Sequence, residues 1–205
     1  PFIDLSRLVG KIREDVLPAW TECLDKCEFV GGPRVATLEK KLAEVLAVPH
    51  VVSCANGTDA ILVALQAMGV KRGMKVALPN LTFWATFEAI AQLGATPVLV
   101  DVNPDDLQLD LDQLKSAHEA HRFDAVILVH LYGWTSARLA EIRAFCKERG
   151  LPLVEDGAQQ ILLVVEIVIH RALASAGAGD DSVVRGAFEA VLREHPALAD
   201  AAVVG

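Results

Sequence analysis

The chain has 205 residues, of which 53% are hydrophobic, and a net charge of −8 at pH 7. This length is enough for one sizeable core, and the acidic balance excludes a basic surface for nucleic acid. The longest apolar run, residues 161–169, is interrupted by Glu166 and is too short to span a membrane.

Apolar spacing predicts helices first and then an alternation of strands and helices. Residues 5–24 and 35–46 have helical spacing, with an expected kink at Pro18 and a glycine turn between the two segments. From residue 50 onward, short β-branched or apolar runs alternate with amphipathic stretches. The predicted strands are residues 50–53, 75–78, 96–100, 125–130 and 151–155, and the predicted helices are residues 58–68, 84–93, 111–120 and 137–149.

This alternation implies βαβ crossovers, so the predicted fold class is α/β. We expect a three-layer α/β/α sandwich with a mainly parallel sheet over residues 50–160. In such sheets ligands bind beyond the carboxyl ends of the strands. After Gln160 lysine disappears and alanine and valine rise. We therefore divide the chain into a domain of residues 1–160 and a divergent tail of residues 161–205.

The most informative run is residues 151–159, where an apolar strand ends in Asp156 and an amide, Gln159, follows three residues later. A buried carboxylate is costly unless it has a partner. A protonated pyridine nitrogen is one such partner, and the amide could reach an oxygen on the neighbouring ring edge. The structural alternative for Asp156 is an ordinary salt bridge. The chemical interpretation is half of a site for pyridoxal 5'-phosphate (PLP).

Two further motifs follow predicted strands. Residues 56–59 (Asn-Gly-Thr-Asp) open a helix, where free N–H groups favour a phosphate, although the same residues also suit an ordinary N-cap. Trp84 could stack on a flat heteroaromatic ring or belong to the core. Thr82 and Thr86 could donate to a ligand or cap the helix. His130, at the end of another strand, could be a base or a ring neighbour, or a partly buried structural histidine.

Four cysteines are too few for a disulfide framework, and the N-terminus lacks the pattern of a signal peptide. We therefore expect reduced thiols in a cytoplasmic protein. Cys23 and Cys27 lie one helical turn apart, but no third or fourth ligand is near them in sequence, so no metal site is predicted.

Taken together, these motifs resemble the DegT/DnrJ/EryC1/StrS aminotransferases in order and spacing. The matching segments are residues 29–33, 38–39, 56–60, 82–86, 129–133 and 155–159, so the resemblance covers about residues 1–160. It implies the fold type I fold of PLP enzymes. It also implies transfer of an amino group from glutamate or glutamine to a keto sugar on a nucleotide, or to a related cyclitol. Fold type I sites are built from two subunits, so a homodimer is expected.

By resemblance, Gly57 and Thr58 hold the cofactor phosphate and Trp84 stacks on the ring. Asp156 pairs with the ring nitrogen, and Gln159 meets the ring hydroxyl. The chain departs from the family after Gln159, because the family's Schiff-base lysine and smaller C-terminal domain are not recognisable. All eight lysines precede residue 148, and none fits that role. No catalytic residue is therefore assigned, and we expect the chain as given not to transaminate.

Three interpretations remain open at this point. The chain is a large-domain fragment of an aminotransferase, or it keeps the scaffold as a sugar dehydratase or a degenerate binding protein. In the third, it is a hybrid, because residues 187–205 resemble a stretch near the C-terminus of adenylate-forming enzymes. A fusion, a frameshift or a truncation would each explain the junction after Gln159.

Overall fold

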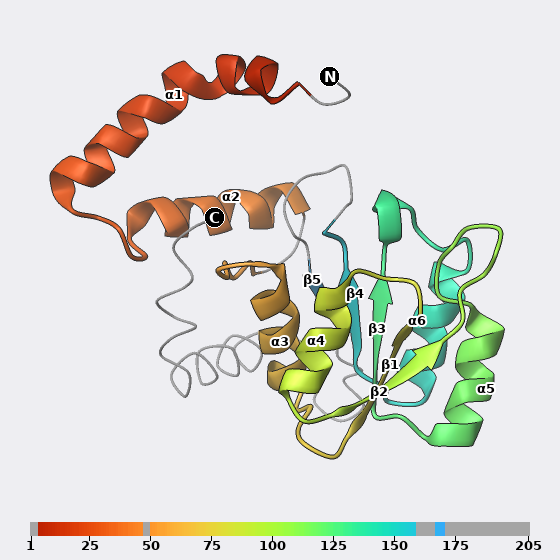
Figure 1. Ribbon diagram of the computed structural model, residues 1–205. Helices are drawn as coiled ribbons and strands as arrows, with labels where there is room; N and C mark the ends of the chain where they lie inside the picture. Colours follow the sequence, from red (N-terminus) through yellow and green to blue (C-terminus); the bar gives the residue numbers. More distant parts are fainter. Residues whose placement is uncertain (1–3, 47–49, 159–166, 171–205) are drawn as a thin grey trace.

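The computed structural model describes residues 4–46, 50–158 and 167–170 (Figure 1). None of the helices in these ranges is both long and apolar enough to cross a bilayer. In chain order the elements are α1 (Leu5–Lys26), α2 (Pro33–Leu46), α3 (Gly57–Ala67), β1 (Lys75–Pro79), α4 (Trp84–Gln92), β2 (Thr96–Val100), α5 (Leu111–His121), β3 (Ala125–Val129), the 3-10 turn η1 (Leu131–Gly133), α6 (Leu139–Glu148), β4 (Leu153–Asp156) and β5 (Ile167–His170).

The strands form one sheet in the order β2-β1-β3-β4-β5. The first four are parallel, and β5 pairs with β4 in the antiparallel direction at the edge. Each parallel pair is joined by a crossover through at least one helix, as parallel strands require. All four parallel strands therefore end at the same edge of the sheet, where Val129 of β3 is opposite Asp156 of β4.

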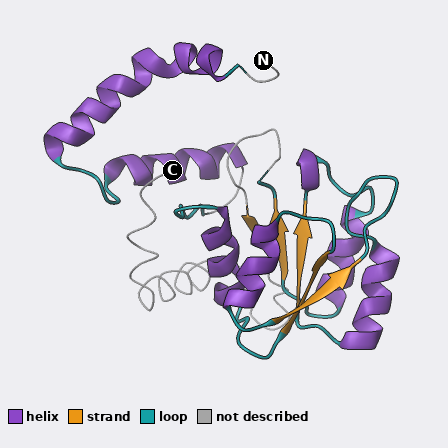
Figure 2. Ribbon diagram, in the orientation of Figure 1, coloured by secondary structure: helices purple, strands orange, loops and turns teal. Residues whose placement is uncertain are grey.

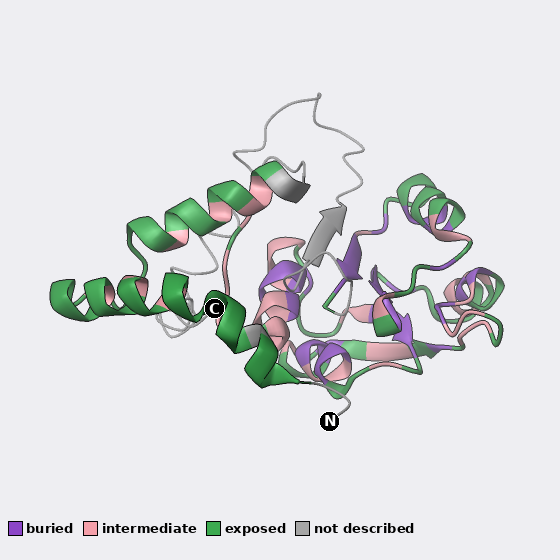
Figure 3. Ribbon diagram, turned by 90° about the horizontal axis from the view of Figure 1, so that it is seen from above, coloured by how far each residue is buried: buried purple, intermediate pink, exposed green. Residues whose placement is uncertain are grey.

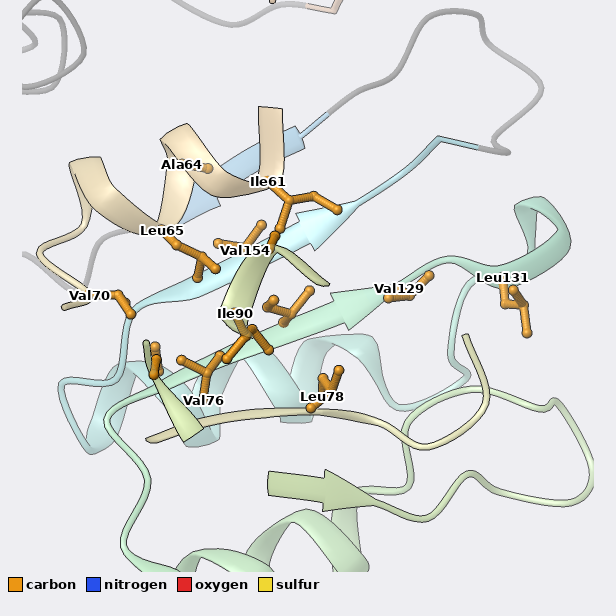
Figure 4. Packing of buried hydrophobic residues seen from close by; sticks show 14 residues of the cluster. Ile61, Ala64, Leu65, Val70, Val76, Leu78, Ile90, Val129, Leu131 and Val154 are labelled. Carbon is orange, nitrogen blue, oxygen red and sulfur yellow. The ribbon is translucent and has the colours of Figure 1, made fainter. Parts of the chain in front are cut away.

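Side chains of successive strand residues point to opposite faces of the sheet, and both faces are covered. On one face, α3 and α4 pack against a buried apolar cluster that includes Ile61, Ile90 and Val154 (Figure 4). On the other face, a second cluster joins α5 and α6 to strand residues such as Leu128 and Leu153. Figure 2 shows the resulting layers of helix, sheet and helix. The predicted fold class is confirmed.

The two N-terminal helices lie outside this sandwich, and most of α1 is exposed (Figure 3). Helix α1 continues through Pro18 to Lys26, and Cys27 ends it in the left-handed conformation. The predicted turn before α2 is present, with Gly31 and Gly32 both at positive φ. A glycine has no Cβ, so it takes this conformation without the strain that other residues meet there.

Most predicted elements form within a few residues of their expected bounds. The strand expected at residues 50–53 is wrong, because the structure has irregular backbone there. The physical reason is visible at Ser53, whose N–H donates to the Glu39 carboxylate of α2 (2.9 Å) instead of to a strand. Most of the tail, residues 161–205, lies outside the described residues, apart from β5. The division at residue 160 therefore stays a prediction.

Candidate functional site

Three segments bring polar or aromatic side chains to the carboxyl edge of the sheet. Asn80 and the first turn of α4 follow β1, His130 follows β3, and Asp156 ends β4. The start of α3 is the fourth predicted part of the site, and α3 packs beside α4 on the Asp156 face of the sheet. The fold therefore gathers segments that are up to about one hundred residues apart in sequence, as the parallel topology requires.

Asn56 caps α3 and leaves its first N–H groups free for a ligand. The Asn56 Oδ1 accepts the N–H of Asp59 (2.9 Å), and its amide donates to the Asp59 carboxylate (2.8 Å). The structural alternative, an ordinary N-cap, is therefore present. It does not exclude anion binding, because the first N–H groups of a helix, here at Gly57 and Thr58, have no intrahelical acceptor.

Trp84 is a surface residue at the start of α4, with 63% of its area exposed. Its ring stacks on that of Phe87, with centroids 4.9 Å apart and an interplanar angle of 30°. The alternative that Trp84 belongs to the core is wrong. One face of a large aromatic ring is packed on the protein, and the rest is available to contact a flat ligand.

Asp156 has only 7% of its area exposed and comes from the face of the sheet that α3 and α4 cover. Burial raises the pKa of its carboxyl. The N–H of Ala158 (3.1 Å to Oδ1), the charge of His130 and the Thr86 hydroxyl each lower that pKa in part. No ion pair within the described part of the chain involves Asp156, so the salt-bridge alternative has no support there.

The buried salt bridge belongs instead to the preceding residue, Glu155. Arg143 of α6 contacts both of its carboxylate oxygens, at 2.6 Å from Nε and 2.7 Å from Nη2. The Nε2 atom of His130 lies 3.2 Å from Glu155 Oε2, and both side chains are buried. His130 is thus a buried residue of the sheet edge, and its main-chain N–H donates to the Asp156 carbonyl (2.9 Å).

Sequence reasoning missed two members of this cluster and left a third open. It gave no role to Glu155 or Arg143, although a carboxylate inside an apolar strand signals the need for a cation. Thr86 was left between ligand donor and helix cap. In the structure Thr86 is buried on α4, and its hydroxyl forms a hydrogen bond with the Asp156 carboxylate. The Thr86 and Thr82 hydroxyl oxygens lie 3.1 Å apart. Thr86 therefore supports the Asp156 carboxylate.

Gln159 lies outside the described residues, so its expected role stays a prediction. All eight lysines lie within the described ranges. Lys75, for example, begins β1 and donates to the carbonyl of His121 (2.8 Å), at the opposite edge of the sheet from Asp156. In those same ranges, no cluster of three or more His, Cys, Asp or Glu side chains could hold a metal ion.

Residues 10–165 match the DegT/DnrJ/EryC1/StrS aminotransferase family. The chain is 39% identical over 158 residues to a UDP-2-acetamido-2-deoxy-3-oxo-D-glucuronate aminotransferase of Pseudomonas aeruginosa, covering 77% of this chain and 44% of that one. It is 34% identical over 162 residues to a 3-oxo-glucose-6-phosphate:glutamate aminotransferase of Bacillus subtilis, covering 78% of this chain and 36% of that one.

Among solved structures, a Bacillus subtilis protein named ntda, crystallised with bound cofactor PMP, superposes with a TM-score of 0.74 at 34% identity. The match covers 80% of this chain and 38% of that one. The chain therefore spans less than half the length of these relatives, and its N-terminal residues are the ones that align.

Proposed function

The chain belongs to the DegT/DnrJ/EryC1/StrS aminotransferase family, and from this premise we propose that it forms the cofactor-binding part of a PLP-dependent sugar aminotransferase. The reaction would move an amino group from glutamate or glutamine to a keto sugar carried on a nucleotide, or to a cyclitol. The relatives named above support the substrate class, because one acts on a UDP-linked 3-oxo sugar and another has glutamate in its name.

The observation that carries this proposal is the state of Asp156. It is a buried carboxylate at the edge of a parallel sheet where ligands bind, and it has hydrogen-bond donors but no ion-pair partner among the described residues. A protonated pyridine nitrogen supplies the missing positive charge together with a donor. When bound, PLP contributes an electron sink for amino transfer, and an anionic Asp156 keeps the ring nitrogen protonated.

Two further parts of the site fit the same cofactor. The N–H groups of Gly57 and Thr58, with the Thr58 hydroxyl, offer donors to a phosphate at the positive end of α3. The exposed ring of Trp84 offers a stacking surface. Gln159 would reach the ring hydroxyl, as the family resemblance implies. These residues bind and orient, and none of them is assigned a proton-transfer step.

We further propose that the chain as given binds the cofactor without covalent attachment and does not transaminate. Covalent attachment and proton transfer in this reaction need a lysine amine. The lysines of this chain lie on the outer helices, in a loop, and at elements away from Asp156, as with Lys75 at the opposite sheet edge. Homodimer formation and a cytoplasmic location are part of the same proposal.

Titration with PLP, followed by absorbance, tests the cofactor site. Asp156→Asn keeps the size of the side chain and removes its charge. We expect weaker PLP binding by about 1–3 kcal/mol and a shifted absorbance band, since one charged hydrogen bond is lost. Asp25→Asn, an exposed carboxylate of α1 outside the sandwich, makes the same change and is the matched control. Equal binding by wild type and Asp156→Asn would show that the assignment is wrong.

Borohydride reduction followed by peptide mapping tests the absence of covalent attachment. We expect no lysine peptide to carry a stoichiometric pyridoxyl group. A single labelled lysine, together with turnover of an amino donor, would overturn this part of the proposal and leave the cofactor assignment intact.

A further inference from the structure

The sheet has a topological switch point between β1 and β3. These strands are parallel neighbours, but the chain continues from β1 to β2 on one side and from β3 to β4 on the other. The connecting helix α4 packs on one face of the sheet and α6 on the opposite face, so the segments after β1 (80–84) and after β3 (130–138) diverge. In open α/β sheets ligands bind at such a point. These two segments are therefore well placed to contact a ligand.

Exposed aromatic side chains follow both strands. Phe83 and Trp84 come after β1 and are 74% and 63% exposed, whereas Tyr132 and Trp134 come after β3 and are 61% and 58% exposed. The whole chain has one tyrosine and three tryptophans, so its tyrosine and two of its tryptophans lie in these two segments. Exposed aromatic surface gathered in one place is typical of a binding site.

Tyr132 has a backbone conformation that favours glycine. Its φ of 59° and ψ of 15° lie in the left-handed region, which is uncommon for a residue with a large side chain. Cys27 and Arg122 share this conformation, but both simply end helices, whereas Tyr132 lies inside the turn η1. Strained backbone of this kind gathers at functional sites, where the surrounding structure must hold it in place.

Hydrogen bonds from the β2–α5 loop hold the segment on both sides of Tyr132. The buried side chain of Gln108 donates from Nε2 to the carbonyl of Leu131 (3.3 Å). The Asp106 carboxylate accepts the N–H of Ala137 (3.3 Å). The segment after β3 is therefore ordered before a ligand binds, so less conformational entropy is lost on binding.

The charges around this segment disfavour a phosphate. Residues 101–110, which hold the segment, include four carboxylates, and the only arginine or lysine in the segments after β1 and β3 is Arg138. Arg138 is already paired with Asp112 (2.8 Å) and with Glu141 (2.8 Å). A ligand at this point therefore presents an uncharged ring to the exposed aromatic side chains.

Among the parts of the proposed substrate, the sugar ring fits this position. It carries the reacting carbon, which must lie beside the cofactor, and Asp156 ends the strand next to β3, opposite Val129. The Pseudomonas and Bacillus relatives both have a 3-oxo sugar in their names, whereas only the former has a nucleotide. One face of a sugar ring consists of C–H groups, and this apolar face can lie on an aromatic ring.

We propose that Tyr132 and Trp134 bind the sugar ring of the substrate and are specificity-determining residues of the site. Their rings contact the C–H face of the sugar, and Trp84 remains available to the cofactor. This inference rests on the proposed function, because the substrate class comes from it. Neither residue is assigned a covalent or proton-transfer step.

Calorimetry on the chain with two pairs of probes tests this assignment. UDP-N-acetylglucosamine is compared with UDP, and glucose 6-phosphate with inorganic phosphate, so each pair differs by the sugar. We expect Tyr132→Ala and Trp134→Ala each to weaken binding of the sugar-containing probes at least about fivefold, since an aromatic contact is lost. Binding of UDP and of phosphate should stay within about twofold of wild type. Equal losses for UDP-N-acetylglucosamine and UDP would place the base on these residues and overturn the inference.

Tyr132→Phe and Trp134→Phe are the matched controls, because each keeps an aromatic ring on the same backbone. We expect their affinity for the sugar-containing probes to stay within about threefold of wild type. The alanine variants should keep the wild-type melting temperature, since the replaced side chains are exposed. If the phenylalanine variants lose as much affinity as the alanine variants, the aromatic faces do not bind the sugar and the inference is wrong.

The PLP titration separates this test from the test of function. If wild type binds no PLP while the alanine variants lose affinity for the sugar-containing probes alone, the cofactor assignment fails and the sugar-binding residues stand. If PLP binds as expected and the alanine variants keep wild-type affinity for those probes, or wild type binds neither of them, the inference fails alone. Sedimentation showing that the alanine variants lose self-association instead would make the segment a contact between copies of the chain, which also overturns the inference.

Discussion

At the scale of single residues, the site is built from groups that lower the stability of the fold. Among the described residues Asp156 is buried without an ion-pair partner, and His130 has a ring nitrogen without a hydrogen-bond partner. Trp84 exposes a large apolar surface. Each of these features is unfavourable in the chain alone, and under the proposed function a ligand with the matching chemistry would offset this cost.

The pH dependence of the free energy of unfolding should reveal how much the burial of the Asp156 carboxylate destabilises the fold. Its folded-state pKa is raised, so the free energy of unfolding falls as pH rises from the unfolded-state value near 3.8 through the folded-state pKa. Asp156→Asn removes this loss. Without cofactor, we expect the variant to be about 1 kcal/mol more stable than wild type at pH 7 and equal to it near pH 3. Denaturant melts at both pH values check this, with Asp25→Asn on α1 as an unchanged control. A variant less stable at pH 7 would contradict it.

At the scale of elements, α2 helps to order the segment that leads into the N-terminal end of α3, the proposed phosphate-binding position. The Glu39 carboxylate accepts from both the N–H and the hydroxyl of Ser53, at 2.9 and 2.8 Å. Ser53 lies three residues before the cap Asn56. Helix α2 lies outside the sandwich, but it is therefore linked to the candidate site by two charge-assisted hydrogen bonds.

Removing this link should weaken binding of the cofactor's phosphate more than binding of its pyridine ring. We expect Glu39→Ala to weaken PLP binding about tenfold, or about 1.4 kcal/mol. Its affinity for pyridoxal, which lacks the phosphate, should stay within about twofold of the wild-type value. Parallel titrations with the two ligands measure the difference. Glu44→Ala on the same helix, an exposed position, is the control. An equal loss of affinity for PLP and for pyridoxal would show that Glu39 supports the whole candidate site and not the N-terminal end of α3 in particular.

At the scale of the whole molecule, α1 presents an apolar stripe that nothing in the described structure covers. Leu5, Val9, Ile12, Trp20 and Leu24 recur at helical spacing and are all exposed. An exposed apolar stripe of this length is typical of an interface. It supports the proposed homodimer, with α1 as a contact surface.

Sedimentation at micromolar concentration tests this directly. We expect wild type to self-associate and Ile12→Glu to weaken the association at least about tenfold, because a charge is placed in a desolvated contact. Lys11→Gln makes the same change in net charge on the opposite side of α1 and should leave association unchanged. A monomeric wild type would contradict the homodimer, and equal effects of both variants would show that charge alone governs association.

The sequence by itself determined the fold class and most elements, because period-2 and period-3.6 apolar patterns are local properties of the chain. It also identified Asp156, Gly57, Thr58 and Trp84 as candidates, since each follows or opens a predicted element in a recognisable motif. The strand expected at residues 50–53 was wrong. A β-branched run forms a strand only if a partner strand is beside it, and the local pattern cannot supply that information.

Only the tertiary structure decided which polar groups meet. Arg143 and Glu155 are separated by a turn and a change of element, and His130 comes from another strand, so their contacts depend on the packing of α6 and on the register of β3 with β4. The same packing decided that Trp84 is exposed while Thr86, two residues later, is buried against Asp156. Burial and electrostatic contact are properties of the assembled layers, and they decide which of the candidate residues lie together in one candidate site.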